Sequence, residues 1–247
     1  MRISSLPSLA SCPGWWLLRR REPDGPVGPA ADTGSAAGKA IELYHAGHTP
    51  REAIALALSD SARAKYPKVD VARARRLAEG YMRDPANPQT CAIDMEREVV
   101  LDTVDARKRP LQLVGHIDQV REGDSDGVKR VWDCKAGVSS EGSKLLGAHA
   151  MQLAGYSVAG GYEPGGIIWL ASYDGAGPYA GQPTHWQAPF SRADADRLLD
   201  TVRLDTAHLR DGLVCVRPGP HCAWCPSSPG VCVQRFREEP PRAEEIV

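Results

Sequence analysis

Two apolar segments that are interrupted by acidic residues constrain the fold of this chain most strongly. Residues 111–120 (LQLVGHIDQV) and 128–136 (VKRVWDCKA) have the Val and Ile content of strands, and the turn-prone residues between them predict a hairpin. Asp118 and Asp133 stand inside these apolar runs, where a carboxylate without a partner is unfavourable. Lys135 follows Asp133 by two residues, so both side chains project from one face of the strand. The hairpin therefore has to gather its charges or pair them with another group.

Such a group of charges is typical of a metal site that faces a phosphate. Two nearby carboxylates repel each other unless a cation separates them, and hard divalent ions take oxygen ligands. An ion held by Asp118 and Asp133 could activate water, while Lys135 could neutralise charge that develops on a phosphate. The plainer alternative is a soluble hairpin with exposed carboxylates, and an Asp-x-Lys triplet taken alone favours that alternative.

The order of elements predicts a mixed α/β fold around one sheet. Residues 22–38, rich in Pro, Gly and Ala, are predicted as a linker, and the charged residues 238–247 as a disordered tail. We expect a single domain over 1–237 with a core over about 38–211. The predicted elements are helices over 39–47, 50–65 and 67–84, strands over 93–102, 111–120 and 128–136, a helix over 143–161, a buried strand over 165–174, an edge strand over 184–190 and a helix over 191–212.

Composition excludes several classes of protein. A hydrophobic content of 42% and a charged content of 25% are typical of soluble globular domains. The net charge of −1 offers no global basic field to a nucleic acid, although basic clusters occur at 19–21, 73–76 and 107–109. No run of eighteen apolar residues predicts a membrane span. The LASC sequence at 9–12 imitates a lipoprotein box but lacks the apolar stretch that should precede it, so we expect a cytoplasmic protein.

The helix predicted over 143–161 carries an amide and a phenol on one face. Gln152 and Tyr156 are four residues apart, which places them one turn apart along that face. They could bond to a sugar-phosphate backbone or orient a water molecule. The alternative is a helix that buries Tyr156 and leaves Gln152 in solvent.

Seven cysteines in a chain without a secretion signal argue against a disulfide framework and favour a metal or cluster site. Cys222, Cys225 and Cys232 lie close together in the HCAWCPSSPGVC segment, which leaves one ligand to find. A zinc ribbon would need a second CxxC pair. From spacing alone, the fourth ligand can be Cys12, Cys215 or His221, the last as a zinc ligand; Cys91 and Cys215 are otherwise expected to be small buried residues.

Taken together, these residues resemble the PD-(D/E)xK nuclease superfamily, and within it the RecB-type and CRISPR-adaptation exonucleases. The resemblance runs from Cys12 to Cys232 and therefore spans nearly the whole chain. Its motifs occur in the order of the family: SSLPSLASCP at 4–13, GKAIE at 38–42, GHID at 115–118, DCK at 133–135 and QLAGY at 152–156.

The resemblance implies a restriction-endonuclease-like core and a set of site residues. Asp118 and Asp133 would be metal ligands, with the Cys134 carbonyl as a third, and Lys135 would be the catalytic lysine. Gln152 and Tyr156 would border the DNA groove. RecB-type members usually carry His where this chain has Glu42, so the helix donates either Glu42 or, if it is shifted by one turn, His45. Glu96 and Glu98 on the preceding strand are candidates for an auxiliary acid.

The same resemblance implies a 4Fe–4S cluster held by four thiolates. Its ligands would be Cys12, Cys222, Cys225 and Cys232. The cluster would tie the two ends of the chain together across the nuclease core, as a structural cross-link. Trp224, between two of the ligands, would shield it.

We therefore expect a DNA exonuclease that depends on Mg²⁺ or Mn²⁺ and acts in recombination, repair or end processing in a bacterium or its phage. The chain has no GxxxxGK[ST] motif, so a helicase or recombination partner would have to unwind the DNA. Two alternatives stay open: an inactive fold of the same kind that binds DNA ends or a partner, and a zinc-stabilised interaction protein.

Overall fold

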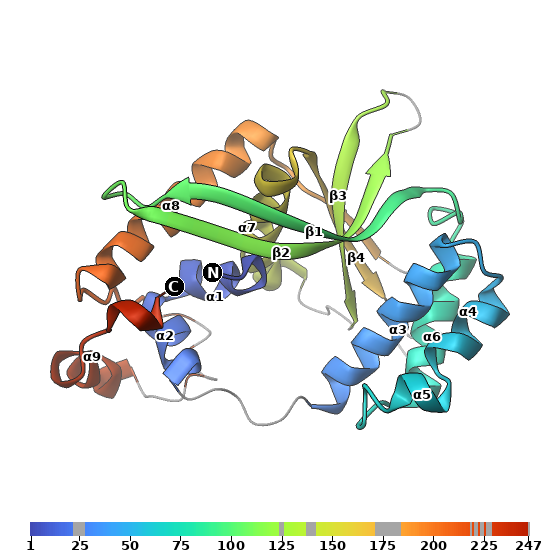
Figure 1. The fold of residues 1–247 in the computed structure, drawn as a ribbon, viewed down its shortest axis with the longest axis horizontal. Coiled ribbons are helices and arrows are strands. Elements are labelled where there is room, and N and C mark those ends of the chain that lie inside the picture. The colour runs from blue at the N-terminus through green and yellow to red at the C-terminus, as the bar shows by residue number, and fades with distance from the viewer. Residues whose placement is uncertain are drawn as a thin grey trace.

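Figure 1 shows the computed structural model, which describes residues 1–21, 28–123, 126–136, 142–170, 184–217, 219, 222, 225 and 229–246. A five-stranded sheet lies at its centre, with the strand order β1-β2-β3-β4-β5. The strands are β1 (Ala92–Val104), β2 (Pro110–Glu122), β3 (Lys129–Ala136), β4 (Glu163–Leu170) and β5 (Thr184–Gln187). All neighbours are antiparallel except β3 and β4, which are parallel because α7 (Gly142–Gly160) lies between them in the chain. This mixed sheet with surrounding helices confirms the predicted α/β fold.

Helices cover both faces of the sheet (Figure 1). One layer is built from α3 (Pro29–His45), α4 (Pro50–Ala57) and α6 (Val71–Arg83), with the short α5 (Asp60–Arg63) after α4. The other layer is built from η1 (Ile3–Ser5), α1 (Leu6–Ser11), α2 (Pro13–Arg21), α7, α8 (Arg192–Arg210) and α9 (Pro229–Glu238). In the described part of the chain, no helix is long and apolar enough to cross a membrane.

The strand β4, which lies between β3 and β5, is buried on both faces. Ile167 belongs to the core under α7 and α8, whereas Ile168 belongs to the core under α3 and α6. Both side chains are fully buried. The prediction of a buried strand is therefore confirmed, and its nearly continuous apolar run reflects burial by helices on each side. Residues 171–174 of that prediction lie outside the described residues.

The predicted linker over 22–38 is wrong from Pro29 onward, because α3 begins there. Pro29 stands at the start of the helix, where its missing N–H is not needed. The polar residues that suggested a loop instead fix the segment before α6: Asp32 Oδ2 accepts from Lys68 N at 2.9 Å, and Thr33 Oγ1 accepts from Asp70 N at 3.0 Å. Small side chains elsewhere on α3 allow close packing against α6.

Two other helix boundaries differ from the predictions. The helix predicted over 50–65 ends at Ala57, where the Ser59 hydroxyl donates to the Leu56 carbonyl at 2.9 Å, and α5 then starts separately. The helix predicted over 67–84 begins at Val71, because Asp70 caps it by accepting from Arg73 N at 3.0 Å. The helix predicted over 191–212 is confirmed as α8, and Ser191 caps it in a capping box with Asp194.

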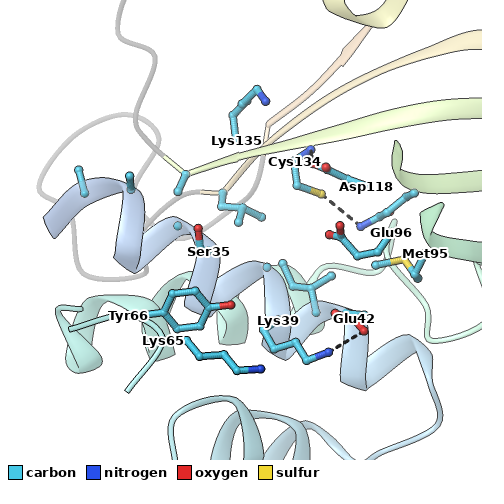
Figure 2. Close-up of a pocket in the computed structure, with 18 residues that line it drawn as sticks. Ser35, Lys39, Glu42, Lys65, Tyr66, Met95, Glu96, Asp118, Cys134 and Lys135 are labelled. Atoms are coloured by element: carbon cyan, nitrogen blue, oxygen red, sulfur yellow. Dashed lines mark hydrogen bonds and ion pairs between the residues drawn. The ribbon is translucent and has the colours of Figure 1, made fainter. Parts of the chain in front are cut away.

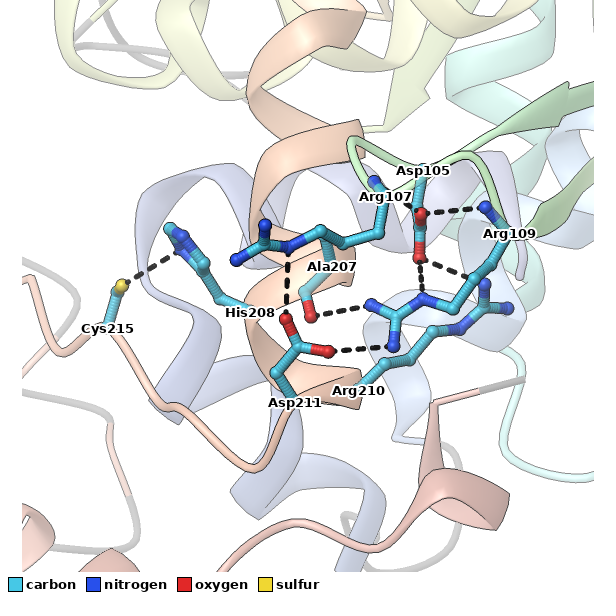
Figure 3. Close-up of polar contacts among 8 residues, drawn as sticks. All are labelled: Asp105, Arg107, Arg109, Ala207, His208, Arg210, Asp211 and Cys215. Atoms are coloured by element: carbon cyan, nitrogen blue, oxygen red, sulfur yellow. Dashed lines mark hydrogen bonds and ion pairs between the residues drawn. The ribbon is translucent and has the colours of Figure 1, made fainter.

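The tip of the β1–β2 hairpin is fastened to α8 (Figure 3). Asp105, which is 1% exposed, accepts from the Arg107 and Arg109 amides and from the Arg109 and Arg210 guanidinium groups. Asp211, just after α8, binds the same Arg107 and Arg109 side chains at 3.3 and 2.8 Å. This network positions the long β1–β2 ladder, on which part of the site described below is built.

The expected disordered tail differs from the structure over residues 238–246. The Arg21 guanidinium donates two hydrogen bonds of 2.9 Å to Glu245, which lies in η3 (Ala243–Glu245). Ile246 is fully buried in the core, and Phe236 of α9 lies under the Arg21 side chain. Charged residues of this segment therefore bind α2, and the two ends of the chain lie together.

Candidate active site

The strands β2 and β3 stop pairing where two aspartates stand. Their last paired residues are Gln119 and Trp132, so Asp118 and Asp133 occupy the next position on each strand. Beyond this point β3 continues alongside β4 as far as its last residue. Where the β2–β3 ladder stops, the Cys134 amide donates to Asp118 Oδ2 at 2.8 Å. The structure thus brings the predicted acidic residues together at a fork in the sheet.

Asp133 is buried on the α7 side of the sheet, where three polar side chains converge on it. Lys135 Nζ lies 2.8 Å from Oδ1 and from Oδ2 of Asp133. Gln152 Nε2 donates to Asp133 Oδ1 at 3.3 Å and to the Tyr156 hydroxyl at 3.1 Å. Gln152 and Tyr156 are themselves buried and lie behind the aspartate. Their position fixes the orientation of the Asp133 carboxylate.

The proximity of the two aspartates changes the pKa of Asp118. Burial, and then the negative charge of Asp133, raise the pKa of Asp118 to about 8, while Lys135 and the Cys134 amide act in the opposite direction. Burial alone would lower the pKa of Lys135, but the Asp133 and Asp118 carboxylates outweigh it and raise that pKa. Burial raises the pKa of Tyr156 to about 12. Lys135 is therefore a cation, and Asp118 is an acid that ionises easily once a further cation is present.

Asp118 and Lys135 line a cavity of about 740 Å³ between the sheet and α3 (Figure 2). Glu42 and Lys39 enter it from α3, and Lys39 Nζ lies 2.7 Å from Glu42 Oε1. Glu96 of β1 points into the same space beside Asp118. Three acidic side chains thus face one cavity from a helix and two strands. Lysines 39, 65 and 135 line it as well.

His45, the alternative to Glu42, lies away from this cavity. Its Nδ1 is 2.8 Å from the Gln89 carbonyl oxygen, and its Nε2 is 2.7 Å from the Tyr81 hydroxyl. Burial lowers the pKa of His45. Since both ring nitrogens have partners inside the helical layer, Glu42 is the residue of α3 that faces the aspartates. Glu98, also on β1, is exposed and does not line the cavity.

The donor set of this site fits a hard divalent ion. Carboxylates and a backbone carbonyl are the ligands that Mg²⁺ and Mn²⁺ favour. Asp133 Oδ2 is buried and makes no hydrogen bond, although Lys135 Nζ lies close to it. Among the described residues, no three carboxylates of the cavity have ligand oxygens within 4.8 Å of one another.

A separate group of potential ligands does meet this spacing. Asp205, His208 and Cys215 have ligand atoms within 4.8 Å, and Cys215 Sγ lies 3.6 Å from His208 Nδ1 (Figure 3). However, both oxygens of the buried Asp205 accept from the Arg217 guanidinium, at 2.6 and 2.8 Å. This carboxylate is therefore already paired with a cation, and the group is a structural ion pair with a neighbouring thiol and imidazole.

In the described part of the chain, none of the four cysteines predicted to hold a cluster forms a disulfide. Cys12 Sγ is buried and accepts from the Trp15 and Arg217 amides, both at 3.4 Å. Cys222 Sγ accepts from the Gly219 amide at 3.4 Å, and Cys232 is buried one turn before Phe236 of α9. His221 and Trp224 lie outside the described residues.

A buried polar network behind the site was missed at the level of the sequence. Arg121 is 9% exposed and donates to Gln119, Asn87 and the Tyr81 hydroxyl, and Gln119 Nε2 donates to Cys134 Sγ at 3.2 Å. The signal was available, because Gln119 and Arg121 alternate along a strand that is otherwise apolar there. The network fixes the backbone of β3 beside Asp133.

Comparisons with known proteins identify a family for this chain. A family model described as the PD-(D/E)XK nuclease superfamily matches residues 3–232. Fifteen chains of solved structures also match. One of them, described as "Crystal structure of SSO0001", is 17% identical over 85% of this chain and 88% of its own, with a TM-score of 0.38. No curated protein matches the chain.

Proposed function

The chain belongs to the PD-(D/E)XK nuclease superfamily, and from this we propose that it is a DNA exonuclease that hydrolyses phosphodiester bonds with the help of a divalent metal ion. The observation that carries the proposal is the meeting of Asp118, Asp133 and Lys135 where β2 and β3 separate. The two carboxylates could hold a metal ion, and the ammonium group beside them could neutralise charge on a phosphate. Together these groups could promote hydrolysis of a phosphodiester.

Each residue has a distinct role in this proposal. Asp118, Asp133, Glu42 and the Cys134 carbonyl would hold the ion, Mg²⁺ or Mn²⁺, which would polarise the phosphate and acidify an attacking water. Lys135 would neutralise negative charge on the phosphate, which its raised pKa allows because the amine stays protonated. Gln152, buttressed by Tyr156, would keep the Asp133 carboxylate in a fixed orientation.

The charges around the cavity support a polyanionic substrate. Lys39, Lys65 and Lys135 line it together with the acids, although the chain as a whole carries a net charge of −1. Basic residues that are confined to one cavity can contact phosphates locally, and such contacts weaken as salt displaces them. We propose that the substrate is DNA, presented as a single strand or a duplex end during recombination, repair or end processing, with a helicase or recombination protein as partner.

A 4Fe–4S cluster on Cys12, Cys222, Cys225 and Cys232 is the second part of the proposal. Backbone amides donate to the sulfurs of Cys12 and Cys222, and hydrogen bonds of this kind favour thiolates as cluster ligands. Gly14, two residues after Cys12, lies against Phe236, which brings α2 next to α9, the helix that carries Cys232. The group would supply a covalent tie between the chain ends.

Digestion of end-labelled DNA tests the proposed activity. Wild-type protein should release mononucleotides or short fragments from labelled single-stranded or duplex DNA with Mg²⁺ or Mn²⁺, and not with EDTA. Asp133→Asn should abolish cleavage, and Lys135→Met should slow it about 10²- to 10³-fold, as does the loss of one transition-state donor elsewhere. Lys129→Met, an exposed lysine at the start of the same strand, is the matched control and should cleave normally.

Cleavage by Asp133→Asn at the wild-type rate would refute the proposal. Binding of DNA ends without metal-dependent cleavage by the wild type would point instead to an inactive fold of the same kind.

A further inference from the structure

Glu96 has a backbone conformation that a glutamate rarely adopts. Its φ angle is +50°, in the left-handed region, although it stands in the middle of β1. In the described part of the chain, Lys108 is the other residue besides glycine with a positive φ, and it occupies the β1–β2 turn, where such an angle is common. A residue other than Gly in this region is unfavourable by about 1 kcal/mol, and it persists where the surroundings or a function require it.

The unusual angle occurs where β1 borders the cavity. Met95 and Glu96 both line the cavity that contains Asp118. The pairs Met95–Gln119 and Arg97–Ile117 flank Glu96 and Asp118, so these two acids stand opposite each other on neighbouring strands. Asp118 and Gln119 also line the cavity together. Both strands thus turn a carboxylate into one space.

The Glu96 side chain is exposed, and its placement is not explained by a hydrogen bond or an ion pair with any described residue. Among the described residues, no side chain donates a hydrogen bond to its carboxylate or forms an ion pair with it. Its nearest electrostatic neighbours include Glu42 across the cavity, and Glu42 has Lys39 as a partner. Partial burial and the charge of Glu42 raise the pKa of Glu96, with His116 and Lys39 acting in the opposite direction. A strained backbone segment therefore places an exposed carboxylate beside other acids.

We propose that Glu96 is an additional ligand of the divalent ion held by Asp118 and Asp133, and that the left-handed backbone is retained in order to direct it there. The inference rests on the proposed function, since it assigns a further residue to the same metal site. It explains why Glu96 keeps an unfavourable backbone conformation beside the carboxylates of Asp118 and Glu42. These carboxylates repel one another, but each of them would be attracted to a divalent cation placed between them.

Substitution by glycine separates backbone strain from metal binding, because glycine adopts φ +50° without penalty. In EDTA, Glu96→Gly should raise the melting temperature by about 2 °C, the shift that relief of about 1 kcal/mol gives in a chain of this size. In a Mn²⁺ titration followed by thermal shift and by electron paramagnetic resonance, the same variant should bind Mn²⁺ at least tenfold more weakly. Glu96→Gln should weaken binding similarly without relieving the strain.

Matched variants serve as controls. Lys108→Gly relieves the same kind of backbone angle far from the cavity, so it should raise the melting temperature in EDTA and leave Mn²⁺ affinity unchanged. Glu98→Gln removes a nearby exposed charge of β1 and should also bind Mn²⁺ normally. Wild-type affinity for Mn²⁺ in both Glu96 variants would overturn the inference.

Asp118→Asn distinguishes this outcome from failure of the proposed function. If Asp118→Asn loses Mn²⁺ while the Glu96 variants keep it, the metal site stands and Glu96 is not a ligand. If Asp118→Asn also binds Mn²⁺ like the wild type, the proposed site itself is wrong.

Discussion

The fold strongly changes the ionisation of the Asp118 side chain. It lies partly covered beside Asp133 and receives a hydrogen bond from the Cys134 amide. Its raised pKa means that the protein without a metal ion holds a proton at this site under neutral conditions. A divalent ion would replace that proton, so metal binding and proton release are linked at this residue.

This linkage predicts a pH-dependent stability in the absence of divalent ions. The pKa of Asp118 is about 8 in the folded protein, against about 3.9 for an unperturbed Asp. Between these values the folded state binds a proton that the unfolded state does not, so the free energy of unfolding falls as pH rises from about 4 to about 8. In EDTA, the melting temperature should fall over this range, and Asp118→Asn should flatten the decrease. Identical pH profiles for both proteins would contradict the prediction.

The motifs predicted the acidic residues and Lys135 correctly as neighbours, because two strands joined by a short turn have to lie side by side. Their detailed environment could not be predicted. The positive φ of Glu96 and the burial of Gln152 and Tyr156 depend on where β2 and β3 separate, which is a property of the packed sheet. The choice between Glu42 and His45 likewise depends on the rotation of α3 against its neighbours.

Among the elements, the β1–β2 hairpin depends most on a single buried charge. Asp105 has a fully buried side chain and binds Arg109 and Arg210, whereas Asp211 binds Arg109 with 30% of its side chain exposed. Removal of a buried carboxylate leaves its cationic partners without a counter-charge. This lowers the free energy of unfolding more than the loss of an exposed ion pair does.

Asp105→Ala should therefore lower the free energy of unfolding by about 3 kcal/mol. Asp211→Ala, which removes a half-exposed partner of the same Arg109, should lower it by less than about 1 kcal/mol. Urea titrations of both variants check the difference. Equal losses would show that burial of Asp105 does not determine the stability of the hairpin.

The elements also show where sequence patterns succeed. The strands were predictable from their Val and Ile content, and the starts of α4 and α8 from Pro50 and Ser191. The start of α3 was not, because Pro, Gly and Ala are also typical of linkers. Its helical conformation depends on contacts of Asp32 and Thr33 with a segment more than thirty residues away.

At the scale of the whole molecule, residues near the two ends of the sequence pack against each other beside the nuclease core. Arg21 binds Glu245, and Cys12 lies next to Arg217, so residues from both ends pack on the same side of the sheet. The charged C-terminal composition did not predict this docking, since its partner is at the opposite end of the sequence. The family resemblance, which assigned Cys12 to the same cluster as three C-terminal cysteines, did imply that the ends meet.

The proposed cluster predicts a coloured protein. Anaerobically purified wild type should be brown and contain about four iron atoms per chain, and Cys12→Ser should lose most of the iron. Cys91→Ser, a thiol outside the proposed set, should keep it. Colourless protein with one zinc ion per chain would contradict the cluster and support a zinc-stabilised arrangement of the same thiols.

Anomalous diffraction from a crystal soaked in Mn²⁺ would test the metal site most directly. We expect a peak within about 2.5 Å of carboxylate oxygens of both Asp118 and Asp133, at the fork between β2 and β3. A peak that appears instead at Asp205, His208 and Cys215, with none at the fork, would contradict the assignment of these aspartates as the metal ligands of a nuclease.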